Sequence, residues 1–150
     1  MKKYIRFGAM ILTSTIIMYF LMYLNVFEFS HATLSETRIY MAILMGATMA
    51  VIMMLFMWHM YDNKKLNGII LASAAVVFGI SLYLVRSQTT VDQVSWMKAM
   101  IPHHSIAILT SERANLEDER VVELSESIIE AQRREIDEMK MLIEELENEE

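Results

Sequence analysis

Three long uncharged runs constrain this chain more than any other feature of its sequence. They cover residues 7–27, 39–61 and 66–85, which are 21, 23 and 20 residues long. An α-helix rises about 1.5 Å per residue, so each run would reach about 30 Å, the thickness of the hydrocarbon core of a bilayer. Within lipid, a helix pairs its own backbone polar groups. The sequence therefore predicts three transmembrane helices within residues 1–85.

The basic residues predict the orientation of these helices. Three basic residues precede the first run, and Lys64 and Lys65 separate the second from the third, whereas Arg38 is the one basic residue between the first two. Because Lys and Arg collect on the cytoplasmic side, we expect a cytoplasmic N-terminus and a periplasmic or extracellular C-terminal domain. The first run also resembles a secretory signal, but it is longer than the roughly 7–15 residues of a signal core, which favours an uncleaved anchor.

The remainder of the chain has a different composition. Residues 86–150 carry 16 acidic and 7 basic residues, against 3 and 6 in residues 1–85. This acidic part is expected to repel nucleic acid and anionic lipid headgroups, and it is compatible with cations. The chain has no cysteine, which excludes disulfides, thiolate chemistry and Cys-type zinc sites. We predict a separate helical domain at residues 90–148, outside the membrane.

Two helices are predicted in this domain. A capping box at residues 90–93, in which the Thr90 hydroxyl and the Gln93 amide close the first turn, starts the first helix. Pro102 removes one backbone donor, which predicts a kink. Asn115 or Asp118 is expected to cap the second helix, which keeps an apolar three-four spacing over residues 122–146. An αα-hairpin alone buries little apolar surface, so we expect self-association into a four-helix bundle. Docking onto the outer ends of the spans is the competing option.

Soft metal ligands gather in these two helices. The first contains the run Met97-Lys-Ala-Met100-Ile-Pro-His103-His104, and the second contains Gln132, Glu135 and Met139. Thioether and imidazole groups are the ligands that a copper(I)-type site uses. Antiparallel pairing predicts that Met97, Met100, His104 and Met139 converge, with His103 at the flank, Glu135 as an oxygen ligand or supporting group, and Gln132 behind them. The alternative is that the methionines fill an apolar core and His104 is a hydrogen-bonded core residue.

The same residues resemble a known family. The run 100–104, Ala107 and the pattern Gln132-x2-Glu135-Ile136-x2-Met139 are similar to domain-of-unknown-function family 305 over roughly residues 92–146. The resemblance implies a ferritin-like helical bundle, and copper binding in the periplasm for some members. The site residues that it carries over are Met97, Met100, His103, His104, Gln132, Glu135 and Met139, with Gln132 as a supporting residue and the others as metal ligands. This chain differs from the longer soluble members in having three spans and a single hairpin.

No enzymatic activity is predicted. A ferritin-like di-iron oxidase requires two Glu-x-x-His units and two further inward carboxylates. The single such unit of the sequence, residues 28–31, falls in the outer loop between the first two spans. Nothing in the sequence forms a nucleophile–base pair or a phosphate cradle. Whether the loop around His31 reaches the hairpin is left open by the sequence.

Methionine also recurs at every fourth residue along the second span. The members of this ladder are Met41, Met45, Met49, Met53 and Met57. Steps of four residues drift by only about 40°, so the thioethers would form a slowly winding line. One interpretation is metal transport along this line. We favour the other, that methionine is a flexible apolar residue tolerated by lipid.

The sequence thus predicts an all-α fold: three transmembrane helices followed by an extracytoplasmic αα-hairpin that forms a ferritin-like four-helix bundle by self-association. The predicted function is membrane-anchored copper binding on the outer face of the membrane. The alternatives are a membrane assembly module without metal, and metal transport along the second span. The expected partners are membrane lipid and a second copy of the chain.

Overall fold

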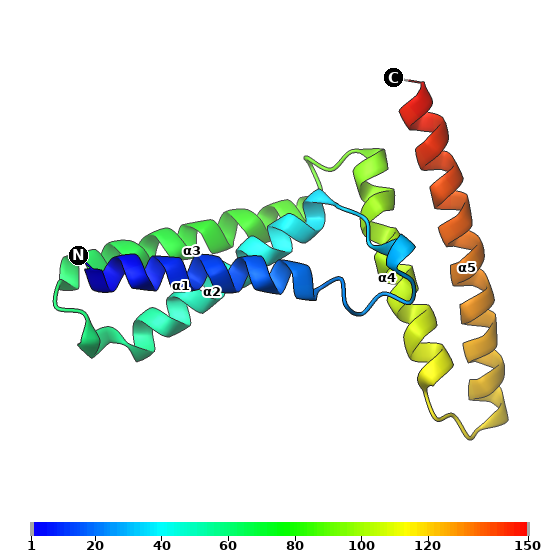
Figure 1. Ribbon diagram of the computed structural model, residues 1–150, viewed down its shortest axis with the longest axis horizontal. Coiled ribbons are helices and arrows are strands. Elements are labelled where there is room, and N and C mark those ends of the chain that lie inside the picture. Colours follow the sequence, from blue (N-terminus) through cyan, green and yellow to red (C-terminus); the bar gives the residue numbers. More distant parts are fainter. Residues whose placement is uncertain (1, 150) are drawn as a thin grey trace. The chain divides into compact units, whose positions relative to one another are not determined.

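The computed structural model describes residues 2–149, which form five α-helices and no β-strand (Figure 1). The α-helices are α1 Lys2–Leu21, α2 Glu36–Phe56, α3 Lys64–Ser87, α4 Gln93–Arg113 and α5 Glu119–Asn148, and two single-turn 3-10 helices are η1 Phe29–His31 and η2 Trp58–Met60. The predicted all-α class is confirmed. The chain divides into two compact units. The membrane unit comprises residues 2–21 and 37–90, and the hairpin unit comprises residues 22–36 and 91–149.

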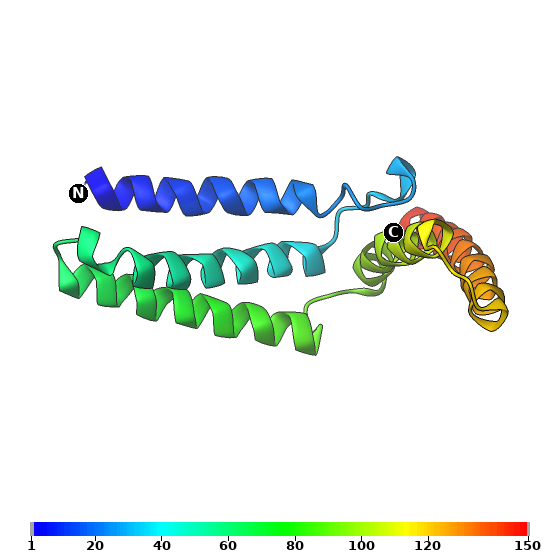
Figure 2. The same ribbon diagram turned by 90° about the horizontal axis from the view of Figure 1, so that it is seen from below.

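The three helices of the membrane unit are long and apolar enough to cross a bilayer. Their mean hydropathies are 1.5 for α1, 2.3 for α2 and 2.3 for α3. They run along a common direction (Figure 2). Only 6%, 22% and 6% of their most apolar stretches are buried inside the protein. Water would disfavour so much exposed apolar surface, whereas lipid would accept it. The structure is therefore consistent with a membrane protein.

The first helix is shorter than the predicted span. α1 ends at Leu21, whereas the uncharged run continues to Phe27. Residues 22–36 instead belong to the hairpin unit, and Phe27 packs against its core. The last residue of this run is therefore in contact with other protein. Hydropathy alone does not distinguish that environment from lipid.

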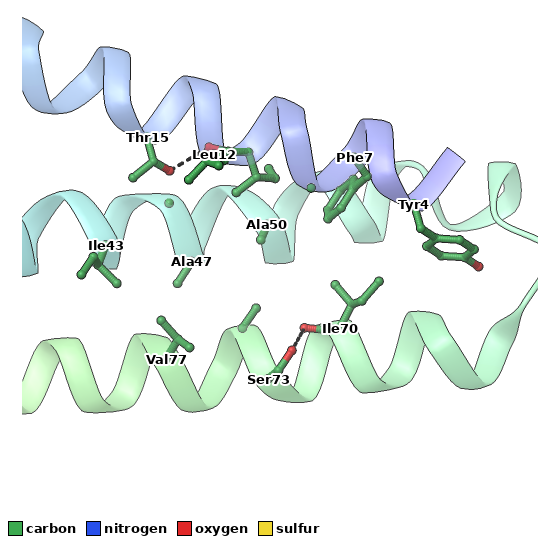
Figure 3. A pocket seen from close by; sticks show the side chains of 14 residues that line it. Tyr4, Phe7, Leu12, Thr15, Ile43, Ala47, Ala50, Ile70, Ser73 and Val77 are labelled. Atoms are coloured by element: carbon green, nitrogen blue, oxygen red, sulfur yellow. Dashed lines mark hydrogen bonds between the residues drawn. The ribbon is translucent and has the colours of Figure 1, made fainter. Parts of the chain in front are cut away.

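An apolar groove of about 500 Å³ lies between the helices of the membrane unit (Figure 3). Phe7 from α1, Ala50 from α2 and Ile70 from α3 are among the side chains that line it. At Gly46 of α2 the groove is narrow, because Thr15 of α1 lies directly against it. A methyl group built on Gly46 would overlap the Thr15 hydroxyl oxygen and would lie 3.3 Å from the Thr15 Cβ. The Thr15 hydroxyl donates a hydrogen bond to the carbonyl of Ile11 (2.8 Å).

We expect Gly46→Ala to destabilise the packing of α1 on α2. Thr15 is β-branched, so turning its side chain places another heavy atom near the new methyl. Overpacking of this kind costs about 1–3 kcal/mol. The melting temperature of the purified protein in detergent measures the effect. Gly68→Ala and Gly79→Ala are matched controls, because a methyl at either position meets nothing within 4 Å. Equal melting temperatures for all three variants would contradict the contact.

The hairpin unit is built on α4 and α5, which pack against each other over their length. We call its buried cluster the hairpin core, and its members are Met97, Ile101, Ile108, Ile136 and Met139. The Asp118 carboxylate caps α5 by accepting a hydrogen bond from the backbone N–H of Arg120 (3.0 Å), as predicted. The predicted cap of α4 was wrong. Asp92, not Thr90, caps α4 and accepts from the Ser95 backbone N–H (2.7 Å), because the Thr90 hydroxyl bonds to Tyr40 instead (3.0 Å).

The connection between α1 and α2 docks onto α4 through Ser105. The fully buried Ser105 hydroxyl accepts a hydrogen bond from the Phe27 backbone N–H (2.6 Å). The same oxygen lies 2.9 Å from Nδ1 of His31, a residue that is only 6% exposed. The loop around His31 therefore forms part of the hairpin unit, which the sequence left open. We call residues 22–36 the docked loop.

Pro102 provides a second docking point for this loop. In an α-helix the N–H of residue 102 would bond to the carbonyl of Lys98, but proline has no N–H. α4 continues through Pro102, and the Thr33 hydroxyl donates to the Lys98 carbonyl in place of the missing donor. α4 runs without a break from Gln93 to Arg113, so Pro102 does not end the helix. The proline acts instead by freeing a carbonyl for the docked loop.

Candidate metal centre

His104 of α4 and Glu135 of α5 meet across the hairpin. The His104 Nε2 atom lies 2.7 Å from Oε2 of Glu135, and Nδ1 lies 3.1 Å from the carbonyl oxygen of Met100. The His104 side chain is 12% exposed and that of Glu135 is 46% exposed. The pair is therefore held by the protein on the histidine side and open to solvent on the glutamate side.

The surroundings of His104 determine which of its ring nitrogens carries a proton. A backbone carbonyl only accepts hydrogen bonds, so Nδ1 must be the donor toward Met100. A neutral ring would then direct the lone pair of Nε2 at the Glu135 carboxylate. Two lone pairs at 2.7 Å repel each other unless a cation lies between them. A proton meets this need when His104 is an imidazolium, and a metal ion is the other cation that both groups can bind.

Three thioethers gather in and beside the hairpin core. Met97 from α4 and Met139 from α5 are both buried in this cluster, and Met100 packs against it half-buried. Isoleucine side chains share the same cluster, so the sulfur atoms of Met97 and Met139 lie in apolar surroundings. Met100 is the more accessible methionine, and its carbonyl is the one bonded to His104.

The remaining sequence-predicted residues lie farther out. His103 is exposed, and its ring centroid lies 6.3 Å from that of His104. Gln132 is half-buried on α5, one turn before Glu135 and Ile136. Within residues 2–149, no three His, Asp or Glu side chains form a group able to hold a metal ion. A metal bound at His104 and Glu135 would therefore take its further ligands from the methionines.

A small polar cavity adjoins the docked loop. It has a volume of about 150 Å³ and is lined by Phe27, Glu28, His31, Ile108, Arg133, Ile136, Asp137 and Lys140. Burial lowers the pKa of His31, and the positive charge of Lys140 lowers it further, while Glu28 and Asp137 oppose the shift. The imidazole is therefore neutral at neutral pH, and its Nδ1 shares a hydrogen bond with the Ser105 hydroxyl.

Sequence reasoning missed Ser105 and the structural role of His31. The motif at residues 28–31 was considered as a di-iron unit and rejected, and the sequence left open whether its loop reaches the hairpin. In the structure His31 Nε2 lies 3.9 Å from Glu28 Oε2, and the histidine serves to fix the loop.

The methionine ladder extends beyond the second helix. Met41, Met45, Met49 and Met53 lie in α2, whereas Met57 follows its last residue, Phe56. Met53 and Met57 pack against a buried cluster of the membrane unit formed by Phe7, Met54 and Tyr61. The regular helical spacing therefore stops at Met53.

Comparison with known proteins relates both units to other chains. Residues 82–149 match a family model described as Domain of unknown function (DUF305). An uncharacterized protein of Acanthamoeba polyphaga mimivirus is 28% identical over 145 residues, which covers 92% of this chain and 93% of the relative. That similarity extends beyond the hairpin unit into the membrane unit. No solved structure matches the chain.

Proposed function

We propose that the chain, whose residues 82–149 match the DUF305 family model, is a membrane-anchored protein that binds copper(I) through its hairpin unit. The proposed ligands are His104, Met100 and Glu135, with Met97 and Met139 completing the set by a small shift of the hairpin core. His103 would be an outer ligand during metal entry, and Gln132 would support Glu135. The role we propose is binding and homeostasis of the metal, without catalysis.

The close approach of His104 to Glu135 carries this proposal. With Nδ1 donating to the Met100 carbonyl, Nε2 would be the nitrogen that binds a metal together with the Glu135 carboxylate. A ligand histidine commonly donates its other N–H to a backbone carbonyl in this way. The neighbouring thioethers are soft donors, which favour copper(I) over magnesium or calcium. The acidic character of residues 86–150 would attract a cation.

We also propose the topology that the charge distribution predicts. The end of the membrane unit with Lys2, Lys3, Lys64 and Lys65 would face the cytoplasm, and the hairpin unit would lie on the outer face. Thioether and imidazole ligands are suitable there, because they need no free thiol in an oxidising compartment.

Copper(I) titration of the detergent-purified full chain, against a competing chelator, tests the proposed ligands. We expect the double substitution His104→Ala with Met100→Ala to weaken the affinity of the hairpin site at least about tenfold, because two ligands are lost. Glu135→Gln should weaken it less, since an amide oxygen remains. Met141→Leu and Glu138→Gln are matched controls, because both residues are exposed on α5 and lie outside the hairpin core. Unchanged affinity in the double variant would remove the assignment.

A second function is favoured by the outer surface of α5. Val121, Leu124, Met141 and Leu142 are large apolar residues exposed on this helix. A second copy of the hairpin could cover them and complete a four-helix bundle, so that the chain is an assembly module without metal. The two functions differ in one measurement. A pure assembly module keeps the same oligomer size whether copper is supplied or removed by a chelator.

A further inference from the structure

A second group of soft ligands surrounds a cavity in the membrane unit, where α1 begins and α2 ends. The cavity has a volume of about 500 Å³, and its lining includes Met10, Met57, His59 and Met60. These residues come from α1, from the residue after α2, and from η2. None of them belongs to the hairpin unit. Met10 could not be grouped with the others from the sequence, because it lies 47 residues before Met57.

The wall of this cavity is fixed by polar contacts. The Lys3 ammonium donates to the Met60 carbonyl (3.2 Å) and pairs with Asp62 (3.3 Å). The Tyr4 hydroxyl lies 2.9 Å from Oδ1 of the fully buried Asn67, to which it donates. These contacts join the start of α1 to η2 and to the start of α3. Met10 of α1 and the pair Met57 and Met60 at η2 thereby line the same cavity.

The donor chemistry of the cavity suits a soft monovalent cation. Three thioethers and one imidazole are neutral ligands of the kind that copper(I) prefers. His59 has no hydrogen-bond or ion-pair partner among the contacts of residues 2–149, so its ring is available. Methionine side chains are flexible, so their sulfur atoms can close on an ion from a wide cavity.

The charges at the cavity also bear on its occupant. Lys3 is neutralised by Asp62, which leaves the Arg6 guanidinium as the free positive charge in the lining. An anionic lipid headgroup is the competing occupant, because basic pockets at this end of a membrane protein can bind one. A single free guanidinium offers little to a phosphate, whereas four soft donors match a metal ion. The balance of ligands therefore favours the cation.

We propose that Met10, Met57, His59 and Met60 form a second soft-metal site, specific for copper(I) or the similar ion silver(I). The site goes beyond the proposed function of the hairpin unit and does not depend on it. It lies at the end of the spans opposite to the start of α2, where the methionine ladder finishes.

Silver(I) binding by the full chain in detergent tests this site, because silver(I) takes soft ligands and has no redox chemistry to interfere. The test starts from a variant with His104→Ala and Met100→Leu, called the background, in which the hairpin site is disabled. We expect this background to retain one silver equivalent after gel filtration, measured by elemental analysis. Adding Met10→Leu, Met57→Leu and Met60→Leu should remove it. Leucine has a similar volume, so the fold should persist, which circular dichroism checks.

The matched control replaces the same number of methionines outside the cavity, with Met41→Leu, Met45→Leu and Met49→Leu. This control should bind silver as the background does. Any of three results would overturn the proposal. The first two are a background protein that binds no silver, and equal silver binding by the cavity variant and the background. The third is that silver does not bind, whereas an anionic lipid copurifies with the protein and is lost in the Arg6→Gln variant. Failure of the hairpin site alone would look different. The His104→Ala, Met100→Leu protein would then bind as much silver as the wild type, and the cavity variant would still lose its equivalent.

Discussion

Replacing Ile136 with Asp is expected to unfold the hairpin unit. Ile136 is 1% exposed and lies in the hairpin core with Ile101 and Ile108. The substitution removes apolar contacts and places a carboxylate where water cannot reach it. Burying an unpaired charge is among the few single changes that cost about 4 kcal/mol or more. A unit of this size has little stability in reserve, so the loss should exceed it.

Hydrogen exchange of the full chain in detergent separates this effect from the membrane unit. Amides of α4 and α5 should lose protection in the Ile136→Asp protein, while those of α2 and α3 keep theirs. Leu142→Asp is the matched control, because Leu142 is 41% exposed on the same helix and its replacement leaves the charge in water. Full protection of α5 in the Ile136→Asp protein would show that the hairpin core does not hold the unit together.

Ser105→Ala is expected to release the docked loop while the hairpin stays folded. The substitution removes the acceptor of the Phe27 N–H and the partner of His31 Nδ1 together. Each buried polar group left unpaired costs about 1–3 kcal/mol. The Thr33 contact with Lys98 remains, but it is a single hydrogen bond. We therefore expect the undocked form to become the major one.

The same exchange measurement reports on this change. Peptides covering residues 22–36 should exchange much faster in the Ser105→Ala protein, and those covering α5 should change little. Ser127→Ala is a suitable control, because Ser127 is exposed on α5 and contacts neither Phe27 nor His31. If residues 22–36 exchange at the wild-type rate in the Ser105→Ala protein, Ser105 does not secure the loop.

The helices of the membrane unit could be predicted because lipid imposes a length and a composition that are visible in one stretch of sequence. α2 and α3 begin within three residues of the predicted spans. The error at the end of α1 has the same origin. Phe27, at the end of the uncharged run, packs against the hairpin core, and a local count of apolar residues cannot reveal a contact with residues far along the chain.

The candidate site, like the helices, could be predicted from the sequence only in part. Helical spacing placed Glu135 on the face of α5 that meets α4, and the structure brings this carboxylate to His104. The docked loop could not be derived in this way. Its contacts depend on Ser105, which looks like any serine in a helix, and on a carbonyl freed by Pro102. From the sequence, the proline predicted only a kink. The backbone carbonyl that it frees becomes a docking point only when another segment supplies a donor, and the sequence does not show which segment does so.

The docked loop also sets an order of events during synthesis. Phe27 must wait for Ser105, which is 78 positions later in the chain. At about 5–20 residues per second, the ribosome needs about 4–16 s to make that stretch. α1 and α2 are complete, and available for insertion, well before the loop between them has its partner. The last step of maturation is therefore the capture of an already tethered loop by the newly made α4, and a protein halted before residue 105 would carry that loop uncovered.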